Sequence, residues 1–429
     1  MKKRDKSLLT DLCGALKAAN RPVRVLTRLS WPAEIRQDFL RRKRKRLPTV
    51  EYSPLDADPV LRSIDQIRQQ IPDSLPHRGW LIRLSDTIET SARLLAVVGT
   101  PKFLKYSSKL FGAPKDPVLD GASTALKLAG TFDHAIDRLC GMDLDAPEDA
   151  DLDTNTVARS MRKALKRMFG DKAPPVKLVD ELSANALAGV KRVRIRRGAQ
   201  FSDKDVQQLI QHEAGVHVAT GLNGRAQPLL PILASAHPGT TRTQEGLAVF
   251  SEFITGSIDL DRLRRLADRV IAIQMAIDGA DFIQVFKYFL ERDPNPEQAF
   301  ESSRRVFRGG PLTGGAPFTK DIVYLDGLIR VHNFLRSAVA EGRADCLQLL
   351  FCGKLDLRDI PMLCELSVHG MVYEPKFRPA WADDQRFLIA YLAYSGFLNT
   401  IDLGTVREHY RQQLHTAPRV RFSSPEELP

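Results

Sequence analysis

The sequence predicts a mainly helical protein of the α+β class, in which a small β-sheet lies beside one histidine-bearing helix. Apolar residues recur at helical spacing over most of the chain. Only two segments, Val176 to Val179 and Lys191 to Arg196, are short, β-branched and alternating. The pair Pro174-Pro175 ends the helical pattern directly before them. We therefore expect helices to form the body of the protein and these two strands to form one small sheet.

The helical patterns fall on both sides of this sheet. They are expected at about residues 31–46, at three places between 58 and 112, at 116–141, up to 170, from 203, and at 259–278, 281–292, 296–307 and 319–339. A polar, acidic linker is expected over residues 143–153. A glycine-rich loop from Gly309 to Gly315 lacks a nucleotide-binding signature, and we expect it to form a mobile rim of the functional site.

Length and composition indicate one large globular domain. The chain has 429 residues with 43% hydrophobic content, which is enough for a substantial core. We expect a basic amphipathic N-terminal region over residues 1–50, a single domain over 51–415 and a polar C-terminal tail over 416–429. The net charge of +11 favours anionic partners such as nucleic acid, acidic membrane surfaces or acidic peptides, without choosing among them.

The N-terminus and the cysteines predict the compartment. No early apolar run has the length of a signal peptide or a membrane span. The five cysteines are odd in number and contain no C-x-x-C pair, which is typical of free thiols in a reducing environment. We therefore expect a cytoplasmic protein without a membrane span, whose cysteines are not metal ligands.

The run from Arg41 to Arg46 is the most basic stretch of the chain. It could bind nucleic acid by neutralising phosphates. No aromatic residues accompany it as a stacking platform, and it follows an amphipathic segment that begins near Trp31-Pro32. The favoured interpretation is a solvated helix end, where cations stabilise the helix C-terminus.

The segment around Gln211-His212-Glu213-Ala214-Gly215-Val216-His217 carries the functional prediction. Ser202 and Asp205 predict the start of its helix by side-chain capping. Glu213 and His217 continue the apolar stripe of this helix, so two ionisable groups point at the core. Burying both is costly unless each has a partner, and a bound cation would satisfy both.

His212 does not fit a regular helix, because five residues at helical spacing turn its ring well away from that of His217. The familiar zinc helix has the form H-E-x-x-H, whereas this chain has H-E-x-x-x-H. A single wide turn of the π type would absorb the extra residue. We expect it at Gly215, where the backbone deforms most easily.

The third metal ligand is expected from a separate helix, with a fourth position left for water. Glu245, in the sequence Gln-Glu-Gly-Leu-Ala, is the candidate. Thr241 to Gln244 fits a capping box, which would place Glu245 in the first turn of its helix. His237 is the alternative third ligand.

These motifs, with the intervening Thr220 to Pro228, resemble the bacterial QEGLA-motif proteins described as modulators of flavohemoglobin expression. That family is similar to the eukaryotic microtubule-associated tyrosine carboxypeptidases. The resemblance extends to Gly99-Thr100-Pro101-Lys102-Phe103 and to Phe318-Thr319-Lys320-Asp321, and it covers most of the chain.

The resemblance implies a large helical, zincin-like metallopeptidase domain with the small sheet beside the metal-binding helix. His212, His217 and Glu245 would hold Zn²⁺, and Glu213 would be the general base. The expected substrate is a peptide or protein C-terminus. A zinc esterase or amidase with the same parts remains an alternative, as does a non-enzymatic regulator that binds nucleic acid or protein.

Two further roles are expected from the residue types that such a reaction needs. An oxyanion requires a hydrogen-bond donor, for which Tyr324 is the candidate, although a core tyrosine fits the pattern equally well. A free terminal carboxylate requires a cation, for which Arg242, Lys320 and Arg330 are the candidates.

Overall fold

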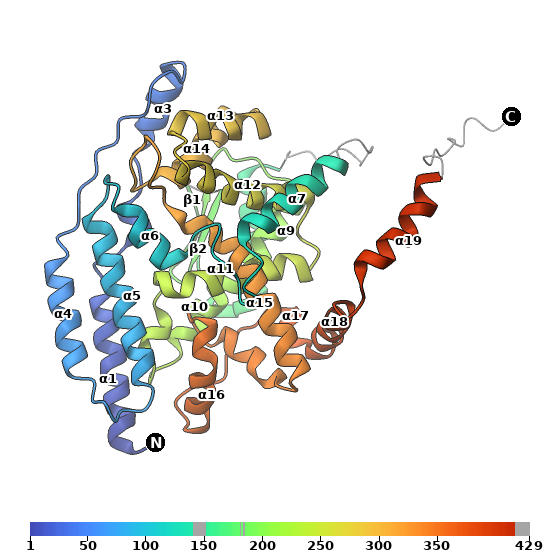
Figure 1. Ribbon diagram of the computed structural model, residues 1–429. Helices are drawn as coiled ribbons and strands as arrows, with labels where there is room; N and C mark the ends of the chain where they lie inside the picture. Colours follow the sequence, from blue (N-terminus) through green and yellow to red (C-terminus); the bar gives the residue numbers. More distant parts are fainter. Residues whose placement is uncertain (140–151, 181, 183–184, 417–429) are drawn as a thin grey trace.

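The chain folds as a mainly helical body with one three-stranded sheet, as predicted (Figure 1). The computed structural model describes residues 1–139, 152–180, 182 and 185–416. Before the sheet lie α1 (Lys3–Ala19), α2 (Val25–Arg28), α3 (Ala33–Arg41), α4 (Asp58–Gln69), α5 (Arg78–Ala96), α6 (Phe103–Phe111), α7 (Ala125–Leu139) and α8 (Thr154–Phe169). Most of the acidic linker predicted for 143–153 lies outside the described residues.

The sheet consists of β1 (Val176–Val179), β2 (Ala186–Gly189) and β3 (Arg192–Arg196). After it come α9 (Asp203–Leu209), a π-helix (Ile210–Val218), α10 (Ala219–Arg225), α11 (Pro238–Ile254), α12 (Leu260–Ile277), α13 (Phe282–Arg292), α14 (Pro296–Phe307), α15 (Val323–Ala340), α16 (Ile360–Val368), α17 (Ala380–Asp383), α18 (Gln385–Leu398) and α19 (Leu403–Thr416). Short 3₁₀ helices include Thr319–Ile322 and Ala344–Phe351.

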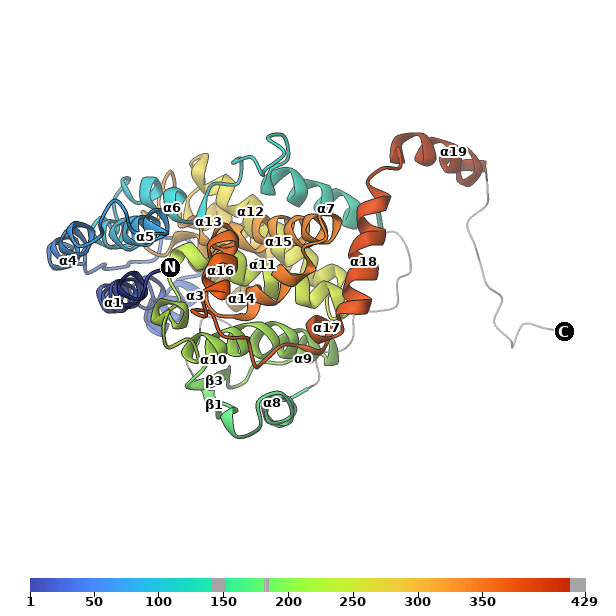
Figure 2. The same cartoon turned by 90° about the horizontal axis from the view of Figure 1, so that it is seen from below.

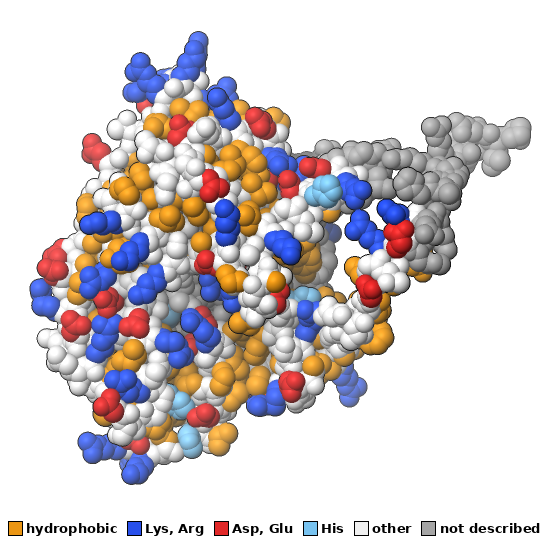
Figure 3. All heavy atoms as spheres, in the orientation of Figure 1, with side chains coloured by type: hydrophobic (Ala, Val, Ile, Leu, Met, Phe, Trp, Pro, Cys, Tyr) orange, Lys and Arg blue, Asp and Glu red, His pale blue; other side chains and the backbone are white. Residues whose placement is uncertain are grey.

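The N-terminal helix α1 packs into the main hydrophobic core. Its residues Leu9, Leu12 and Leu16 are buried in the same cluster as residues of α5 and α11. Figure 1 shows α1, α4, α5 and α6 side by side along one flank of the molecule. Basic and acidic side chains are interspersed over the face seen in Figure 3, and basic ones gather at the tip of α3. There the run Arg41 to Arg46 is exposed, as expected for a solvated helix end.

The sheet has the order β1-β3-β2, with β1 parallel and β2 antiparallel to β3. The two predicted strands are confirmed, but β2 was not expected, because its sequence Ala-Leu-Ala-Gly lacks the β-branched residues that indicate a strand. A second hydrophobic cluster joins α8 and the sheet to the π-helix through residues such as Met161, Val193 and Ala214. Figure 2 shows α8, β1 and β3 together on one side of α9 and α10.

Helices α12 and α13 begin at the residues that the sequence predicts, and each is capped by an aspartate side chain. Asp259 caps α12 and Asp281 caps α13, each accepting a backbone N–H three residues on. No residue of the loop from Gly309 to Gly315 lines the pocket at the histidines, so the prediction that it forms a rim of the site is wrong. Two of its glycines are packed against other segments. A Cβ on Gly309 would lie 2.4 Å from the side chain of Phe103, and one on Gly314 would lie 2.6 Å from the carbonyl of Gly279.

Helices α11 and α15 cross at the centre of the body (Figure 1). Their backbones meet at Gly246 and Gly327, where a Cβ on Gly246 would lie 2.2 Å from the Gly327 carbonyl carbon. This close approach needs glycine on both helices. It places Glu245 of α11 near Tyr324 of α15.

Helix α18 packs against α15 and buries Leu388 and Leu392 in the main core, whereas α19 extends away from the body in both Figure 1 and Figure 2. Residues 417–429 of the predicted tail lie outside the described residues. Among the helices that the structure describes, none combines the length and the apolarity needed to cross a membrane.

Candidate metal centre and its pocket

A π-helix brings the two histidines of the H-E-x-x-x-H motif together. Ser202 and Asp205 form the predicted capping box at the start of α9, and the helix widens from Ile210 to Val218. In a π-helix the backbone bonds join residues five apart, so side chains at that spacing lie close to one another. The ring centroids of His212 and His217 are 4.9 Å apart. The predicted widening is confirmed, although it spans nine residues rather than a single turn.

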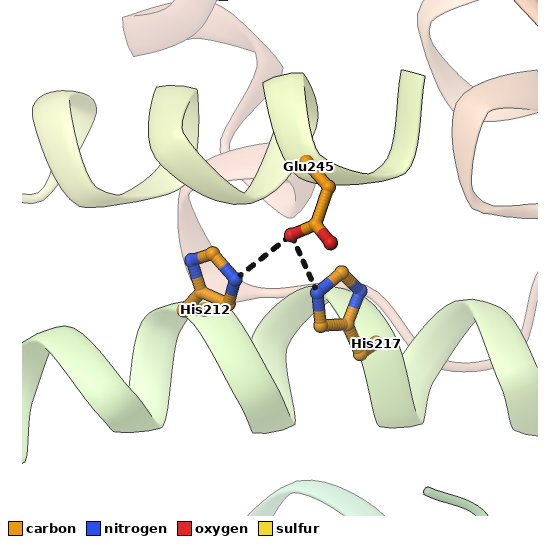
Figure 4. Close-up of side chains that lie close together, drawn as sticks. All are labelled: His212, His217 and Glu245. Carbon is orange, nitrogen blue, oxygen red and sulfur yellow. Dashed lines mark ion pairs between the residues drawn. The ribbon is translucent and has the colours of Figure 1, made fainter. Parts of the chain in front are cut away.

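Glu245 reaches the two imidazoles from the neighbouring helix. Figure 4 shows its carboxylate on α11 pointing between the two rings. Its Oε2 atom lies 3.4 Å from Nε2 of His212 and 3.5 Å from Nε2 of His217. The predicted helix start at Thr241 is wrong: α11 begins at Pro238, with His237 as its N-cap. Proline favours the first helical position, because its N–H is missing where a helix would leave that donor unpaired, and because its φ angle is already helical. This preference outweighs the capping pattern at Thr241.

These three side chains fit a divalent metal ion. Two imidazoles and one carboxylate are the ligand set of many catalytic zinc sites, with bond lengths of about 2.0–2.2 Å. A tetrahedron of that size has edges of roughly 3.4 Å, and the two nitrogen–oxygen distances match this value. Among the described residues, these three form the group of potential ligands close enough to share one ion. His237 is not part of it.

A buried carboxylate that the sequence did not single out supports His212. Glu252 is fully buried and lies seven residues after Glu245, on the same face of α11. It accepts hydrogen bonds from His212 Nδ1 at 2.6 Å, from Gln208 Nε2 at 2.8 Å, and from the Arg262 guanidinium at 2.9 Å. A carboxylate behind a ligating histidine fixes its ring and its tautomer. The i, i+7 spacing of the two acids is the signal that could have revealed it.

The pKa values of the two histidines shift in opposite directions. Burial alone would lower the pKa of His212, but the Glu245 and Glu252 carboxylates raise it to about 10. Burial holds the pKa of His217 below its usual value. Burial alone would raise the pKa of Glu252, but Arg262 and His212 lower it to about 2. Burial alone would likewise raise the pKa of Glu245, but Lys320 and the two histidines hold it well below its usual value. Both carboxylates are therefore charged beside the histidines, which favours a bound cation.

Glu213 stands apart from the three ligand atoms. Its Oε2 accepts a hydrogen bond from the backbone N–H of Ala188 at 2.8 Å. Ala188 belongs to β2, one of the two edge strands of the sheet, so a strand that the sequence did not predict positions the expected general base. Its other carboxylate oxygen has no hydrogen-bond partner within the described part of the chain.

Lys320 and Tyr324 lie beside Glu245. Lys320 Nζ is 2.8 Å from Glu245 Oε1 and donates to the Tyr324 hydroxyl at 3.1 Å. Burial alone would lower the pKa of Lys320, but the Glu245 carboxylate raises it. Burial raises and the surrounding cations lower the pKa of Tyr324, with a net decrease.

Arg242 and Arg330 lie away from these groups. Both pair with Asp326, at 2.6 Å from Arg242 Nε and 3.0 Å from Arg330 Nε. Neither lines the pocket described next.

A pocket of about 700 Å³ opens onto the site. His217, Glu245 and Lys320 form part of its wall, and Ala188 to Lys191 form another part. Lys354 also lines it and donates to the backbone carbonyl of His217 at 3.1 Å and to Gln244 Oε1 at 2.7 Å. Lys354 thus connects the π-helix to α11, a role that no local pattern around it indicated. The basic residues of the lining are Lys17, Arg21, Arg24, Lys191, Lys320 and Lys354.

Comparison with known protein families covers most of the chain. The family model for microtubule-associated tyrosine carboxypeptidases matches residues 37–400. The chain belongs to this family. The resemblance read from the sequence motifs is therefore confirmed. A search of curated proteins gives no match.

The matched range contains every residue of the candidate metal centre. It leaves out α1 and α2, so three of the basic pocket residues, Lys17, Arg21 and Arg24, come from a part of this chain that the tyrosine carboxypeptidase family model does not cover.

Proposed function

We propose that the chain is a zinc-dependent carboxypeptidase that releases a residue from the C-terminus of a peptide or protein. The spacing of the His212, His217 and Glu245 ligand atoms carries this proposal, because it matches the edges of a tetrahedral metal site. Membership of the tyrosine carboxypeptidase family supports it. The free thiols of Cys13, Cys346, Cys352 and Cys364 support a reducing, cytoplasmic location.

In this proposal His212, His217 and Glu245 hold the ion. When bound, Zn²⁺ supplies Lewis acidity and lowers the pKa of a water molecule. Glu213 accepts the proton of the attacking water and then donates it to the nitrogen of the leaving amine. The Ala188 N–H holds one oxygen of Glu213 and leaves the other for this proton transfer.

Tyr324 is proposed to stabilise the oxyanion that forms on the peptide carbonyl. Its hydroxyl oxygen accepts hydrogen bonds from Lys320 and from Arg305 at 3.4 Å. With its oxygen occupied by two cations, the hydroxyl is free to donate its own proton to a developing negative charge. Lys320 positions both Glu245 and Tyr324.

The substrate is proposed to enter through the 700 Å³ pocket, which can hold an aromatic side chain with several neighbouring residues. Six of its lining residues are basic and only Glu245 is acidic, so the pocket favours anionic peptide ends. The family name indicates tyrosine as the residue released.

A library of peptides with free C-termini tests this function. Mass spectrometry after incubation with the metal-loaded protein should show loss of single C-terminal residues. Glu213→Gln should abolish this loss while retaining the metal, because a neutral amide at this position cannot accept the proton. Asp203→Asn, an exposed acid on the preceding helix, is the matched control and should remain active. Internal cleavage, or full activity of Glu213→Gln, would contradict the proposal.

A further inference from the structure

Two cysteine thiols outside the candidate metal centre face each other. Cys346 lies on the 3₁₀ helix Ala344–Phe351 and Cys364 lies on α16, and their Sγ atoms are 3.6 Å apart. The two sulfurs are therefore in van der Waals contact, at a separation roughly 1.5 Å longer than a disulfide bond. The two helices pack against each other. A small movement of the two side chains brings the sulfurs within bonding distance.

The pair has no third partner that would make it a metal site. Among the described residues, no further cysteine, histidine or carboxylate lies close enough to both sulfurs to share an ion with them. A structural zinc site needs four such ligands. A covalent bond between the two sulfurs is therefore the chemistry that this pair offers.

The two sulfurs differ in how easily a reagent reaches them. Cys346 is only 6% exposed, whereas Cys364 is half-buried. Figure 1 shows α16, which carries Cys364, at the lower edge of the molecule. A small oxidised thiol can thus react with Cys364 first, and Cys346 lies beside it as the thiol that completes the reaction.

The other cysteines that the structure describes are not arranged in this way. Cys13 and Cys352 are 0% and 1% exposed. The Cys352 thiol donates to the backbone carbonyl of Tyr373 at 3.7 Å, and burial raises its pKa to about 12. Such a thiol is seldom in the thiolate form that reacts. The geometry singles out Cys346 and Cys364 within the described part of the chain.

The segment between the two cysteines carries a residue of the pocket wall. Lys354 lies on this segment and donates to Gln244 Oε1 at 2.7 Å. The backbone N–H of Leu357 donates to Thr243 Oγ1 at 3.0 Å. Both contacts hold the segment against α11. A bond between cysteines 18 positions apart would close the segment into a loop and reduce its freedom to open.

We propose that Cys346 and Cys364 are a site of reversible disulfide formation, and that the bond fastens the segment of Lys354 to the pocket wall. The oxidant is a low-molecular-weight disulfide such as oxidised glutathione. The Cys364 thiolate attacks one of its sulfurs, which forms a mixed disulfide and releases one glutathione thiolate. The Cys346 thiolate then attacks Cys364 Sγ and releases the second.

The two protons of the cysteine thiols pass to the released glutathione thiolates, so two cysteines are oxidised and one small disulfide is reduced. This modification does not depend on the proposed peptidase function.

Incubation of the full chain in glutathione buffers, followed by blocking of free thiols and mass spectrometry, tests bond formation. Wild type should lose two hydrogen atoms and yield a cross-link between Cys346 and Cys364 that dithiothreitol reverses. The bond should form at least about tenfold faster in the folded protein than in urea, because the fold holds the two sulfurs together. Equal rates, or no bond in the folded protein, would overturn the proposal.

Two variants identify the sulfurs. Cys364→Ser removes a half-buried thiol and should form no intramolecular bond. Cys352→Ala is the matched control, because no lysine or arginine separates Cys346 from Cys352 and trypsin leaves both on one peptide. It should form the bond as wild type does. A cross-link that disappears in folded Cys352→Ala would overturn the assignment to Cys346.

Hydrogen exchange tests the effect on the pocket wall. The backbone N–H of Lys354 donates to the Leu233 carbonyl at 2.8 Å, and that of Leu357 donates to Thr243. Both amides should exchange at least about tenfold more slowly in oxidised than in reduced wild type, because the bond restricts opening of the loop. Exchange in Cys364→Ser should not respond to the oxidant. Equal rates in oxidised and reduced wild type would overturn the fastening of this segment.

Discussion

Replacing Glu252 with glutamine should weaken metal binding without touching a metal ligand. The side chain is fully buried and receives hydrogen bonds from His212, Gln208 and Arg262. Glutamine keeps the shape and removes the charge, so the His212 ring loses the charged acceptor that orients it. Loss of such a supporting carboxylate typically costs about 10- to 100-fold in metal affinity, or roughly 1.4–2.8 kcal/mol.

The same substitution should destabilise the fold. Arg262 would be left buried without its carboxylate, which costs about 3–5 kcal/mol in comparable sites. Competition with a chromophoric chelator measures the affinity, and urea unfolding of the metal-free protein measures the stability. Glu301→Gln is the control, because Glu301 is also buried and pairs with Arg304 and Arg36 away from the metal centre. It should lose stability and keep the wild-type metal affinity. A folded Glu252→Gln protein with wild-type affinity would refute the reasoning.

Three further predictions follow from other contacts. Gly246→Ala should destabilise the protein by about 1–3 kcal/mol or more, because its Cβ would lie 2.2 Å from the Gly327 backbone. Gly130→Ala on α7, which has open space around it, should instead stabilise the protein by about 0.5–1 kcal/mol. Chemical unfolding of both variants checks this pair. Burial lowers the pKa of His237 to about 4, so the contribution of this residue to stability is complete above pH 6.5 and is lost as the pH falls toward 4. The unfolding free energy of wild type should therefore drop more steeply between pH 6.5 and 4 than that of His237→Gln. Parallel curves for the two proteins would contradict the lowered pKa of His237. Adding Zn²⁺ at about 100 times its dissociation constant should stabilise the metal-free protein by about 2.7 kcal/mol, and an unchanged melting temperature would show that the ion does not bind to the folded state.

Short sequence patterns predicted the helix starts and the widened helix, because neighbouring residues in the chain determine both. Ser202, Asp259 and Asp281 each cap a helix through their own side chain, and each of these helices begins where expected. The extra residue between Glu213 and His217 predicted a widened helix, because a regular helix cannot bring the two rings together.

Features that depend on tertiary contacts were not predictable in this way. Strand β2 has a sequence without β propensity and is held by pairing with β3 and by the bond from Ala188 to Glu213. Arg269 of α12 and Arg305 of α14 meet around Tyr324 of α15, although the three residues are distant in sequence. Glu252 and Lys354 acquire their roles through partners on other segments. Sequence spacing alone carries little information about such groups.

Metal analysis of three purified proteins tests the central claim most directly. Wild type and Glu213→Gln should each contain about one zinc ion per chain, because the general base is not a ligand in this account. His217→Ala should contain none after the same purification and should remain folded, since its side chain is 17% exposed at the pocket wall. A full complement of zinc in folded His217→Ala would contradict the assignment of His212, His217 and Glu245 as the metal centre.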